Sequence, residues 1–244
     1  MSWSDQVFRY CERAADPQFW AEPFNALSNI AFLIAAGLAL AERARLRAAR
    51  LSHRASRRGA DDFLIVLLIG LVAAIGVGSF LFHSLATRWA RFADVAPIGL
   101  FMATYLVFAL RCFLGLAWRT VGLGLVTFAA VNGLVAVFAC PRPSLDLIGY
   151  VREPCLNSTM AYTPALATLI VVALLVRRRH PAGRGMLIAA GLFLAAILAR
   201  SLDKVGCAST VLLGQPRGTH ALWHLAVAGV AYVLLRAAIG HRRP

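Results

Sequence analysis

The 244-residue sequence has little charge and very little negative charge: 15% of its residues are charged, and only 11 are Asp or Glu. With 60% hydrophobic residues and a mean hydropathy of +0.71, this scarcity excludes a disordered chain, a coiled coil and an ordinary soluble domain. The chain also lacks an internal repeat, a low-complexity tract and a linker long enough to divide it. These absences favour one membrane domain.

The apolar residues fall in runs of about 18 to 22, the length that a helix needs to cross a bilayer. Seven such segments occur, at about 24–41, 63–83, 94–110, 118–138, 161–176, 185–199 and 219–237. We therefore predict an all-α polytopic membrane protein, a seven-transmembrane-helix bundle that forms a single domain over residues 1–244.

The N-terminal residues lack the basic, apolar and cleavage regions of a signal peptide, so residues 1–23 are expected to remain as an extracytoplasmic segment before an uncleaved first helix. Alternate loops differ strongly in charge. One side carries 16 Lys and Arg with three acids, whereas the other carries nine with eight acids. Because cytoplasmic loops hold the positive excess, we place the N-terminus outside and the C-terminus in the cytoplasm.

The net charge of +14 has a simple interpretation in this topology. Basic loops orient the helices and attract anionic lipid head groups, and no aromatic-interleaved basic face indicates nucleic-acid binding. The expected partners are therefore membrane lipids, with no nucleic acid, and the sequence indicates no protein partner.

Three histidines lie near the predicted outer boundary of apolar segments. His83 ends the second segment, whereas His220 and His224 open the seventh at i,i+4 spacing, which places both imidazoles on one helix face. Ionisable residues at membrane depth are costly and commonly functional. Three histidines with one open position are typical of catalytic zinc, and haem ligation is the main competing interpretation. The other histidines, which lie in Arg-rich segments and are interpreted as solvated, are His53, His180 and His241.

Further polar residues occur at the same predicted depth. Ser79 shares a helical face with His83, and Asp94 re-enters the membrane at the start of the third segment. Their simplest roles are a hydroxyl bonded to a carbonyl one turn earlier and an N-cap or dipole partner. Asp94 is also placed to act as general base towards a metal-bound water. Asp203 either orients a histidine as an outer-shell carboxylate or pairs with a neighbouring basic residue.

Four sequence blocks together resemble the alkaline ceramidase family, as a bacterial-type member. They are Tyr10-Cys11-Glu12 followed by Glu22-Pro-Phe-Asn25-Ala-Leu-Ser28-Asn29, then Gly78-Ser79-x-x-Phe82-His83, then Asp94, and finally Leu202-Asp203-x-x-x-Cys207 before His220-x-x-x-His224. That family belongs to a wider group of seven-helix hydrolases and receptors that includes the progestin and adipoQ receptors. The Ser-x-x-x-His, the spaced Asp and the terminal His-x-x-x-His are the specific part of the pattern.

The resemblance implies a zinc ion held by His83, His220 and His224, with Ser79 and Asp94 as catalytic residues. The implied reaction is hydrolysis of the amide of ceramide, or of a related N-acyl lipid, to a long-chain amine and a fatty acid. Asp94 would take the proton from the zinc-activated water, while zinc and the Ser79 hydroxyl would stabilise the oxyanion. The apolar bundle would hold the acyl chain.

Calcium binds an acidic N-terminal segment beside the zinc site in the eukaryotic members. Here Glu12 and Glu22 match acidic positions of that segment, and Asp16 is the residue that would compensate for its departures. Arg9 and Ala14 stand where the eukaryotic pattern has an acid and an Asn. The expected calcium ligands are thus Glu12, Asp16 and Glu22, few carboxylates for a hard cation that needs six or more oxygens.

Four of the five cysteines lie on the predicted outer side. Only Cys112 is not outside; the others are Cys11, Cys140, Cys155 and Cys207. An even number facing an oxidising compartment suggests disulfides, and four thiols allow three connectivities. The resemblance implies a disulfide between Cys11 and Cys207, which we favour together with a pair between Cys140 and Cys155.

Other functions use the same residues. An ester or phospholipid acyl hydrolase would use the same metal on a different substrate. A non-catalytic lipid receptor with structural zinc would not need Asp94. A haem-binding electron carrier would show a Soret band. The Ala/Arg-rich composition favours a bacterial inner membrane protein with its active site towards the periplasmic side. In that setting the physiological substrate could be an N-acyl lipid other than ceramide.

Overall fold

The computed structural model describes residues 2–51, 60–138 and 155–242. Its α-helices are α1 (Pro23–Ser28), α2 (Ile30–Leu51), α3 (Ala60–Leu85), α4 (Arg88–Phe108), α5 (Trp118–Phe138), α6 (Thr163–Arg177), α7 (Ala182–Leu202) and α8 (His220–Ile239). Shorter elements are a π-helical turn (Ala109–Phe113), 3-10 turns (Cys155–Tyr162, Cys207–Ser209, Gly240–Arg242) and strands β1 (Val211–Leu212) and β2 (Gln215–Pro216). With α1 and α2 counted as one span, seven helices of the described chain are long and apolar enough to cross a membrane. The chain is a seven-helix membrane protein, as predicted.

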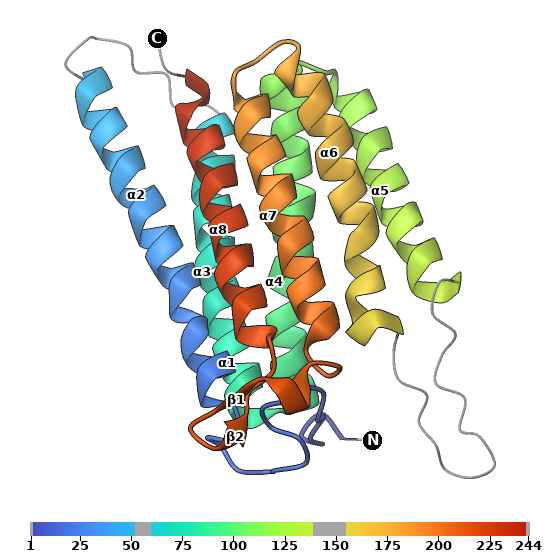
Figure 1. The fold of residues 1–244 in the computed structure, drawn as a ribbon. Helices are drawn as coiled ribbons and strands as arrows, with labels where there is room; N and C mark the ends of the chain where they lie inside the picture. The colour runs from blue at the N-terminus through green and yellow to red at the C-terminus, as the bar shows by residue number, and fades with distance from the viewer. Residues whose placement is uncertain (1, 52–59, 139–154, 243–244) are drawn as a thin grey trace.

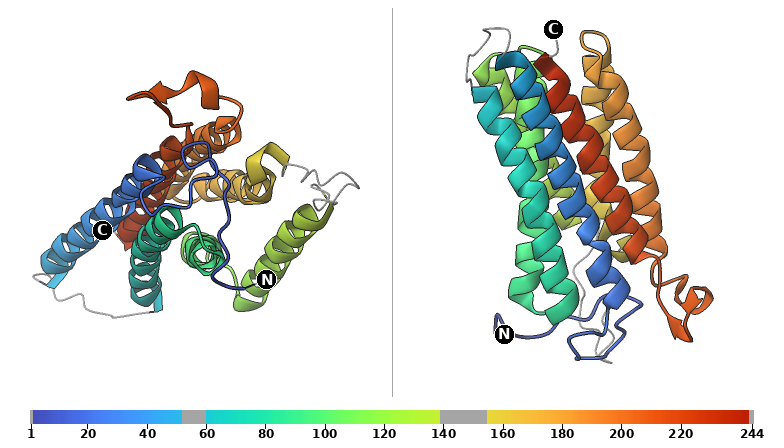
Figure 2. Two further views of the ribbon diagram at one scale, coloured as in Figure 1. Left: turned by 90° about the horizontal axis from the view of Figure 1, so that it is seen from below. Right: turned by 90° about the vertical axis from the view of Figure 1, so that its left-hand side faces the viewer.

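The long helices stand side by side in one bundle (Figure 1). The N-terminal segment, the β1–β2 hairpin, α1 and the first turn of α8 gather at the lower end of Figure 1, which we call the site end. The view from below shows α5 at the edge of the bundle, apart from α2 and α3 (Figure 2). Burial agrees, because 50% of the α8 span is buried but only 6% of the α5 span. Helix α8 is therefore the central helix, and α5 is peripheral.

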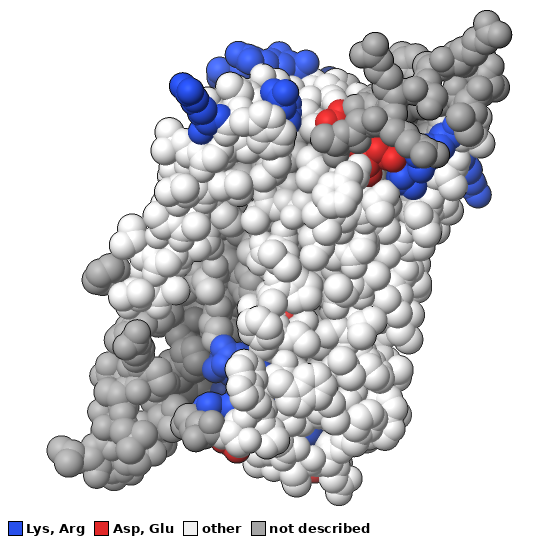
Figure 3. Space-filling view, turned by 180° about the vertical axis from the view of Figure 1, so that it is seen from behind, with Lys and Arg blue, Asp and Glu red and all other residues white. Residues whose placement is uncertain are grey.

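The outer surface is apolar between the two ends. Exposed leucines and valines cover the helices, as on α5, where Leu123, Val126 and Leu134 are each more than half exposed. In the back view a broad white belt separates charged side chains at the upper end from those at the site end (Figure 3). Such a belt meets lipid tails without the cost of burying charge.

Helix α4 begins six residues earlier than the predicted start at residue 94. Thr87 provides the N-cap, because its backbone is extended and its hydroxyl accepts a hydrogen bond from the Ala90 amide at 3.4 Å. Arg88 and Arg91 lower the hydropathy of the first turn, which is why an apolar pattern misses it. Asp94 consequently lies in the second turn of α4 and is not its N-cap, a correction of that interpretation.

The N-terminal segment is tied to the connection between α7 and α8. A disulfide joins Cys11 to Cys207 across 196 residues, which confirms that predicted pairing. The pairing expected between Cys140 and Cys155 is not described, because Cys140 lies outside the described residues. The disulfide holds the N-terminal segment over the first turn of α8, where two of the candidate metal ligands lie.

Candidate metal centre and active site

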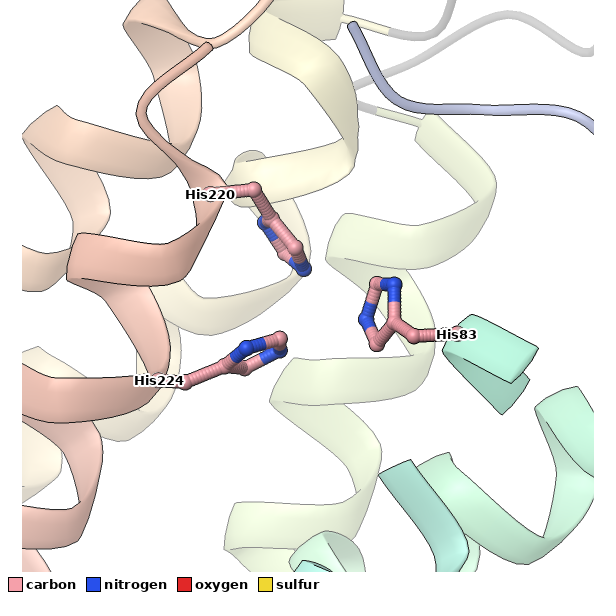
Figure 4. A group of neighbouring side chains, drawn as sticks. All are labelled: His83, His220 and His224. Atoms are coloured by element: carbon pink, nitrogen blue, oxygen red, sulfur yellow. The ribbon is translucent and has the colours of Figure 1, made fainter. Parts of the chain in front are cut away.

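The three predicted histidines come together inside the site end. His83 lies in the last turn of α3, and His220 and His224 lie in the first two turns of α8. Each offers a ring nitrogen within 4.8 Å of the others, and their side chains are 1–2% exposed. The rings face a common space from two helices (Figure 4).

The His83 ring is oriented by Glu22, the residue before α1. Glu22 Oε2 accepts a hydrogen bond from His83 Nδ1 at 2.5 Å. With Nδ1 protonated in this bond, the lone pair of Nε2 is free, and Nε2 is buried without a hydrogen-bond partner in the described structure. A carboxylate behind a ligating histidine fixes the tautomer and raises the basicity of the ligand.

A hydroxyl does the same for His224. Ser28 Oγ lies 2.7 Å from His224 Nδ1 and donates its own proton to the Asn25 carbonyl oxygen at 2.8 Å. Because that proton is committed, Ser28 accepts from Nδ1, and the lone pair of His224 Nε2 is directed inward. Nε2 is 3.4 Å from Ser79 Oγ.

His220 is held by packing and not by a hydrogen bond of its ring. Its imidazole stacks on the Tyr10 ring with centroids 3.8 Å apart, and its Nδ1 is a further buried nitrogen without a hydrogen-bond partner among the described residues. Buried polar atoms are nearly always satisfied. Three converging imidazoles, two of them with a buried nitrogen that lacks a partner, therefore fit a metal ion with a three-nitrogen ligand set.

The expected calcium segment holds a guanidinium instead. The Arg13 side chain is 1% exposed, and its Nε donates to Glu22 Oε1 at 2.6 Å. Its remaining nitrogens donate to four backbone carbonyl oxygens, those of Asp16, Gln18, His83 and Ser84. One carboxylate and several carbonyls thus surround a fixed internal cation. The segment does not fit calcium, because Arg13 fills the position that a hard cation would need.

The other two expected calcium ligands point elsewhere. Both carboxylate oxygens of Glu12 accept backbone hydrogen bonds at the start of α1, from Phe24 and Asn25 at 2.9 Å each, and Oε1 also pairs with Arg217. Asp16 is exposed and bonds the Gln18 amide. Glu12, Asp16 and Glu22 therefore do not converge on one ion.

The pKa values of two acids at the site end, Glu22 and Glu12, shift in opposite directions. Burial opposes ionisation of Glu22, but the electrostatic attraction of the His83 ring and hydrogen bonds from His83, Arg13 and Asn25 outweigh it and lower the pKa of Glu22. Burial raises the pKa of Glu12, although the two backbone N–H groups oppose the shift. The negative charge that supports the histidines is thus best stabilised at Glu22.

Ser79 and Asp94 face each other across α3 and α4. The Ser79 side chain interacts with the Asp94 carboxylate, which is 8% exposed and lies within electrostatic range of His83. Gly78 allows this approach, since a Cβ there would collide with the Ala93 carbonyl group on α4. The close crossing places a carboxylate and a hydroxyl beside the histidines.

Asp203 acts on the backbone of α8. Its carboxylate accepts hydrogen bonds from the amides of Cys11, Thr219 and His220, at 3.0, 2.9 and 2.9 Å. A side chain at Gly218, where φ is 66°, would collide with this carboxylate. Asp203 therefore positions His220 through hydrogen bonds to the backbone at the start of α8.

An apolar cavity lies inside the bundle, and Trp223 of its lining adjoins His224 in the sequence. It contains about 790 Å³ of empty space, including its open side. Helices α3 to α8 all contribute to its wall, and Trp223, the residue before His224, lies at its boundary. Other lining residues include Ile75, Phe101, Tyr105, Phe193 and Tyr162. A hydrocarbon chain fits this lining by its chemistry.

Several residues of the site escaped sequence reasoning. Ser28 and Tyr10 were visible within the matching blocks, but nothing in their spacing indicated contacts with His224 and His220. Arg13 carried no signal beyond being an extra charge in an acidic segment. At the opposite end, Asp61, Cys112 and His241 also approach one another, but they are half-exposed and do not belong to this site.

The fold and the site together define an integral membrane protein with a buried histidine cluster that can hold a metal ion beside a carboxylate and an apolar cavity. The Ceramidase family model matches residues 8–241, nearly the whole chain, and the chain belongs to the Ceramidase family. It is accordingly a ceramidase-like hydrolase of amide C–N bonds, and the family implies a ceramide lipid substrate. A comparison with curated proteins finds no match.

Proposed function

We propose that this protein is a zinc-dependent intramembrane lipid amidase that cleaves ceramide or a related N-acyl lipid to a long-chain amine and a fatty acid. One observation carries the proposal: His83 and His224 both have Nδ1 engaged, by Glu22 and Ser28, so that their Nε2 lone pairs face the same buried space as His220. Tautomers fixed in this way are what a metal ligand set requires.

Zinc bound there supplies Lewis-acid chemistry, by lowering the pKa of water and polarising a carbonyl group. Asp94 takes a proton from the attacking water and returns it to the departing amine, since its carboxylate borders the site without an ion-pair partner within the described chain. Ser79 donates a hydrogen bond to the developing oxyanion. Such a donor is worth about 3 to 4 kcal/mol in the transition state.

The cavity sets the orientation of the substrate. An acyl chain lies against Phe101, Tyr105 and Phe193 inside the bundle, and the amide reaches the histidines near Trp223. The polar end of the lipid then lies at the site end, beneath the N-terminal segment. Apolar walls also exclude bulk water, which strengthens the electrostatic interactions of Asp94 and Ser79.

The site end is proposed to face outward, towards the periplasm of a bacterial inner membrane. Support comes from the loop charges, since the basic loops and the C-terminal tail belong to the opposite end. The disulfide supports the same side, because disulfides persist in oxidising compartments.

Zinc content and turnover, measured together on detergent-purified protein, test the proposal. The wild type is expected to contain about one zinc per chain and to release a fatty acid and a long-chain amine, identified by mass spectrometry. His224→Ala should lose both, whereas His180→Ala, at the opposite end, should lose neither. A folded wild type without zinc, or a His224→Ala variant with full turnover, would overturn it. Release of fatty acid from esters alone would favour an ester or phospholipid hydrolase.

A further inference from the structure

Three arginines lie within electrostatic range of one another or of Asp94 at the site end. Arg9 belongs to the N-terminal segment, Arg91 to the first turn of α4, and Arg200 to the last turn of α7. Burial lowers the pKa of Arg9, and the charges of Arg91 and Arg200 lower it further. None of the three forms an ion pair within the part of the chain that the structure describes.

Arg200 is the most enclosed of the three. The residue is 9% exposed, its guanidinium lies 5.1 to 5.5 Å from the ring centroids of Tyr10, Tyr162 and Trp223, and one nitrogen donates to the Tyr10 hydroxyl at 3.1 Å. Its Nε is buried without a hydrogen-bond partner. Two of these aromatic residues, Tyr162 and Trp223, line the apolar cavity.

Arg9 and Arg91 extend the positive charge outward. Arg9 donates to Ser158 Oγ at 3.2 Å, and its Nε is a second buried nitrogen without a partner in the described structure. Arg91 is exposed and lies one helical turn before Asp94, so both side chains occupy the same side of α4. The cluster thus runs from the cavity wall to the surface.

Among the described residues, the cluster has more positive charge than nearby acids neutralise. Asp94 is the acid of the described chain that interacts with both Arg91 and Arg200, and one carboxylate does not balance three guanidiniums. A buried charge without a partner is strongly destabilising, and Arg200 is buried inside the bundle and so cannot extend to the lipid surface. Planar guanidiniums match the oxygens of phosphate and carboxylate groups. An anion at this place would satisfy the free nitrogens.

We propose that Arg9, Arg91 and Arg200 form an anion-binding site that selects N-acyl lipids whose head group carries a phosphate or carboxylate. The inference rests on the proposed amidase function. Arg200 is linked to the metal centre through Tyr10, whose hydroxyl it contacts and whose ring stacks on His220. An anionic head group would therefore lie beside the histidines while the acyl chain fills the cavity.

The test compares ceramide with ceramide 1-phosphate of the same acyl chain, in mixed detergent micelles. The wild type is expected to favour the phosphorylated lipid in kcat/KM. Arg200→Gln should reduce that preference about 10- to 100-fold, the range expected for a hydrogen bond to a charged group, and Arg200→Lys should keep part of it. The ratio of the two substrates is the readout, because a merely structural defect would slow both equally.

Arg91→Gln is the second variant, since Arg91 is exposed and its replacement should not disturb folding. It is expected to lower the preference less than Arg200→Gln does. A wild type that favours neutral ceramide, or Arg200→Gln and Arg91→Gln variants with the wild-type preference, would overturn the proposal.

Inorganic phosphate separates a lipid head group from a free anion as the occupant. If phosphate inhibits hydrolysis of ceramide 1-phosphate but not of ceramide, the occupant is the lipid head group. If phosphate stimulates hydrolysis of ceramide, the occupant is a free anion beside a neutral lipid. Direct binding to the His220→Ala variant separates this inference from the amidase function. If ceramide 1-phosphate binds in an Arg200-dependent manner but the wild type hydrolyses no amide, the anion site is supported and the proposed reaction is contradicted. If ceramide and ceramide 1-phosphate bind equally, the anion site is contradicted.

Discussion

Replacing Glu22 by Gln tests how the metal centre is supported. The substitution keeps the size of the side chain but removes the charge that accepts the 2.5 Å hydrogen bond from His83 Nδ1. Losing such a partner typically lowers metal affinity about 10- to 100-fold. This range corresponds to about 1.4 to 2.8 kcal/mol of binding free energy. We expect the zinc Kd of Glu22→Gln to rise by that factor in a competition titration with a chromophoric chelator.

The same substitution also weakens the fold, because Arg13 loses the carboxylate that its Nε contacts at 2.6 Å. Breaking a buried pair costs up to about 3 to 5 kcal/mol, so zinc affinity must be measured where both proteins remain folded. Glu12→Gln is the matched control. It removes a carboxylate from the same segment, one that binds two backbone amides and Arg217 but no histidine.

Glu12→Gln is expected to lower the melting temperature with zinc affinity unchanged. An unchanged zinc Kd in folded Glu22→Gln would refute the argument that Glu22 orients His83. An equal loss of zinc affinity in both variants would show that the N-terminal segment affects zinc binding only through its rigidity.

Three further predictions concern the surroundings of the site. Gly78→Ala should force α4 away from α3 at the Ala93 carbonyl and lower kcat by about 10²-fold, the scale of a 1 Å misplacement, with zinc content retained on elemental analysis. Calcium at millimolar concentration should leave the wild-type melting temperature unchanged, and Arg13→Met should unfold at a lower temperature than the wild type. A melting temperature of the wild type that rises with calcium would contradict the conclusion that Arg13 fills the expected calcium position. Replacing Cys11 and Cys207 together by Ser should cost up to about 4 kcal/mol of stability and lower zinc retention during dialysis.

The helices were predictable because a membrane span needs a long apolar run, and seven runs are present. The missing first turn of α4 shows the limit of that signal. Arg88 and Arg91 make this turn polar, and its helical state depends on the Thr87 cap and on packing against the N-terminal segment. A hydropathy pattern records neither.

The site was predictable only where its residues share a helix or a depth. The spacing of His220 and His224 places them on one face, and the end of the second apolar segment places His83 at the same level. Contacts such as Glu22 with His83 or Ser28 with His224 join residues 61 and 196 positions apart. They depend on the rotation of each helix about its axis, which an apolar run does not specify.

The candidate metal ligands come from α3 and from the last long helix, α8, while the hydrogen-bond partners of His83 and His224 precede α2. During synthesis the first ligand enters the membrane long before the other two exist, so a nascent chain with six spans has no complete ligand set. Loading of the proposed metal would therefore follow insertion of the last span, and formation of the disulfide must also wait for Cys207. A C-terminally truncated chain could still insert its earlier helices, but it would lack both the metal centre and the covalent link that retains the N-terminal segment.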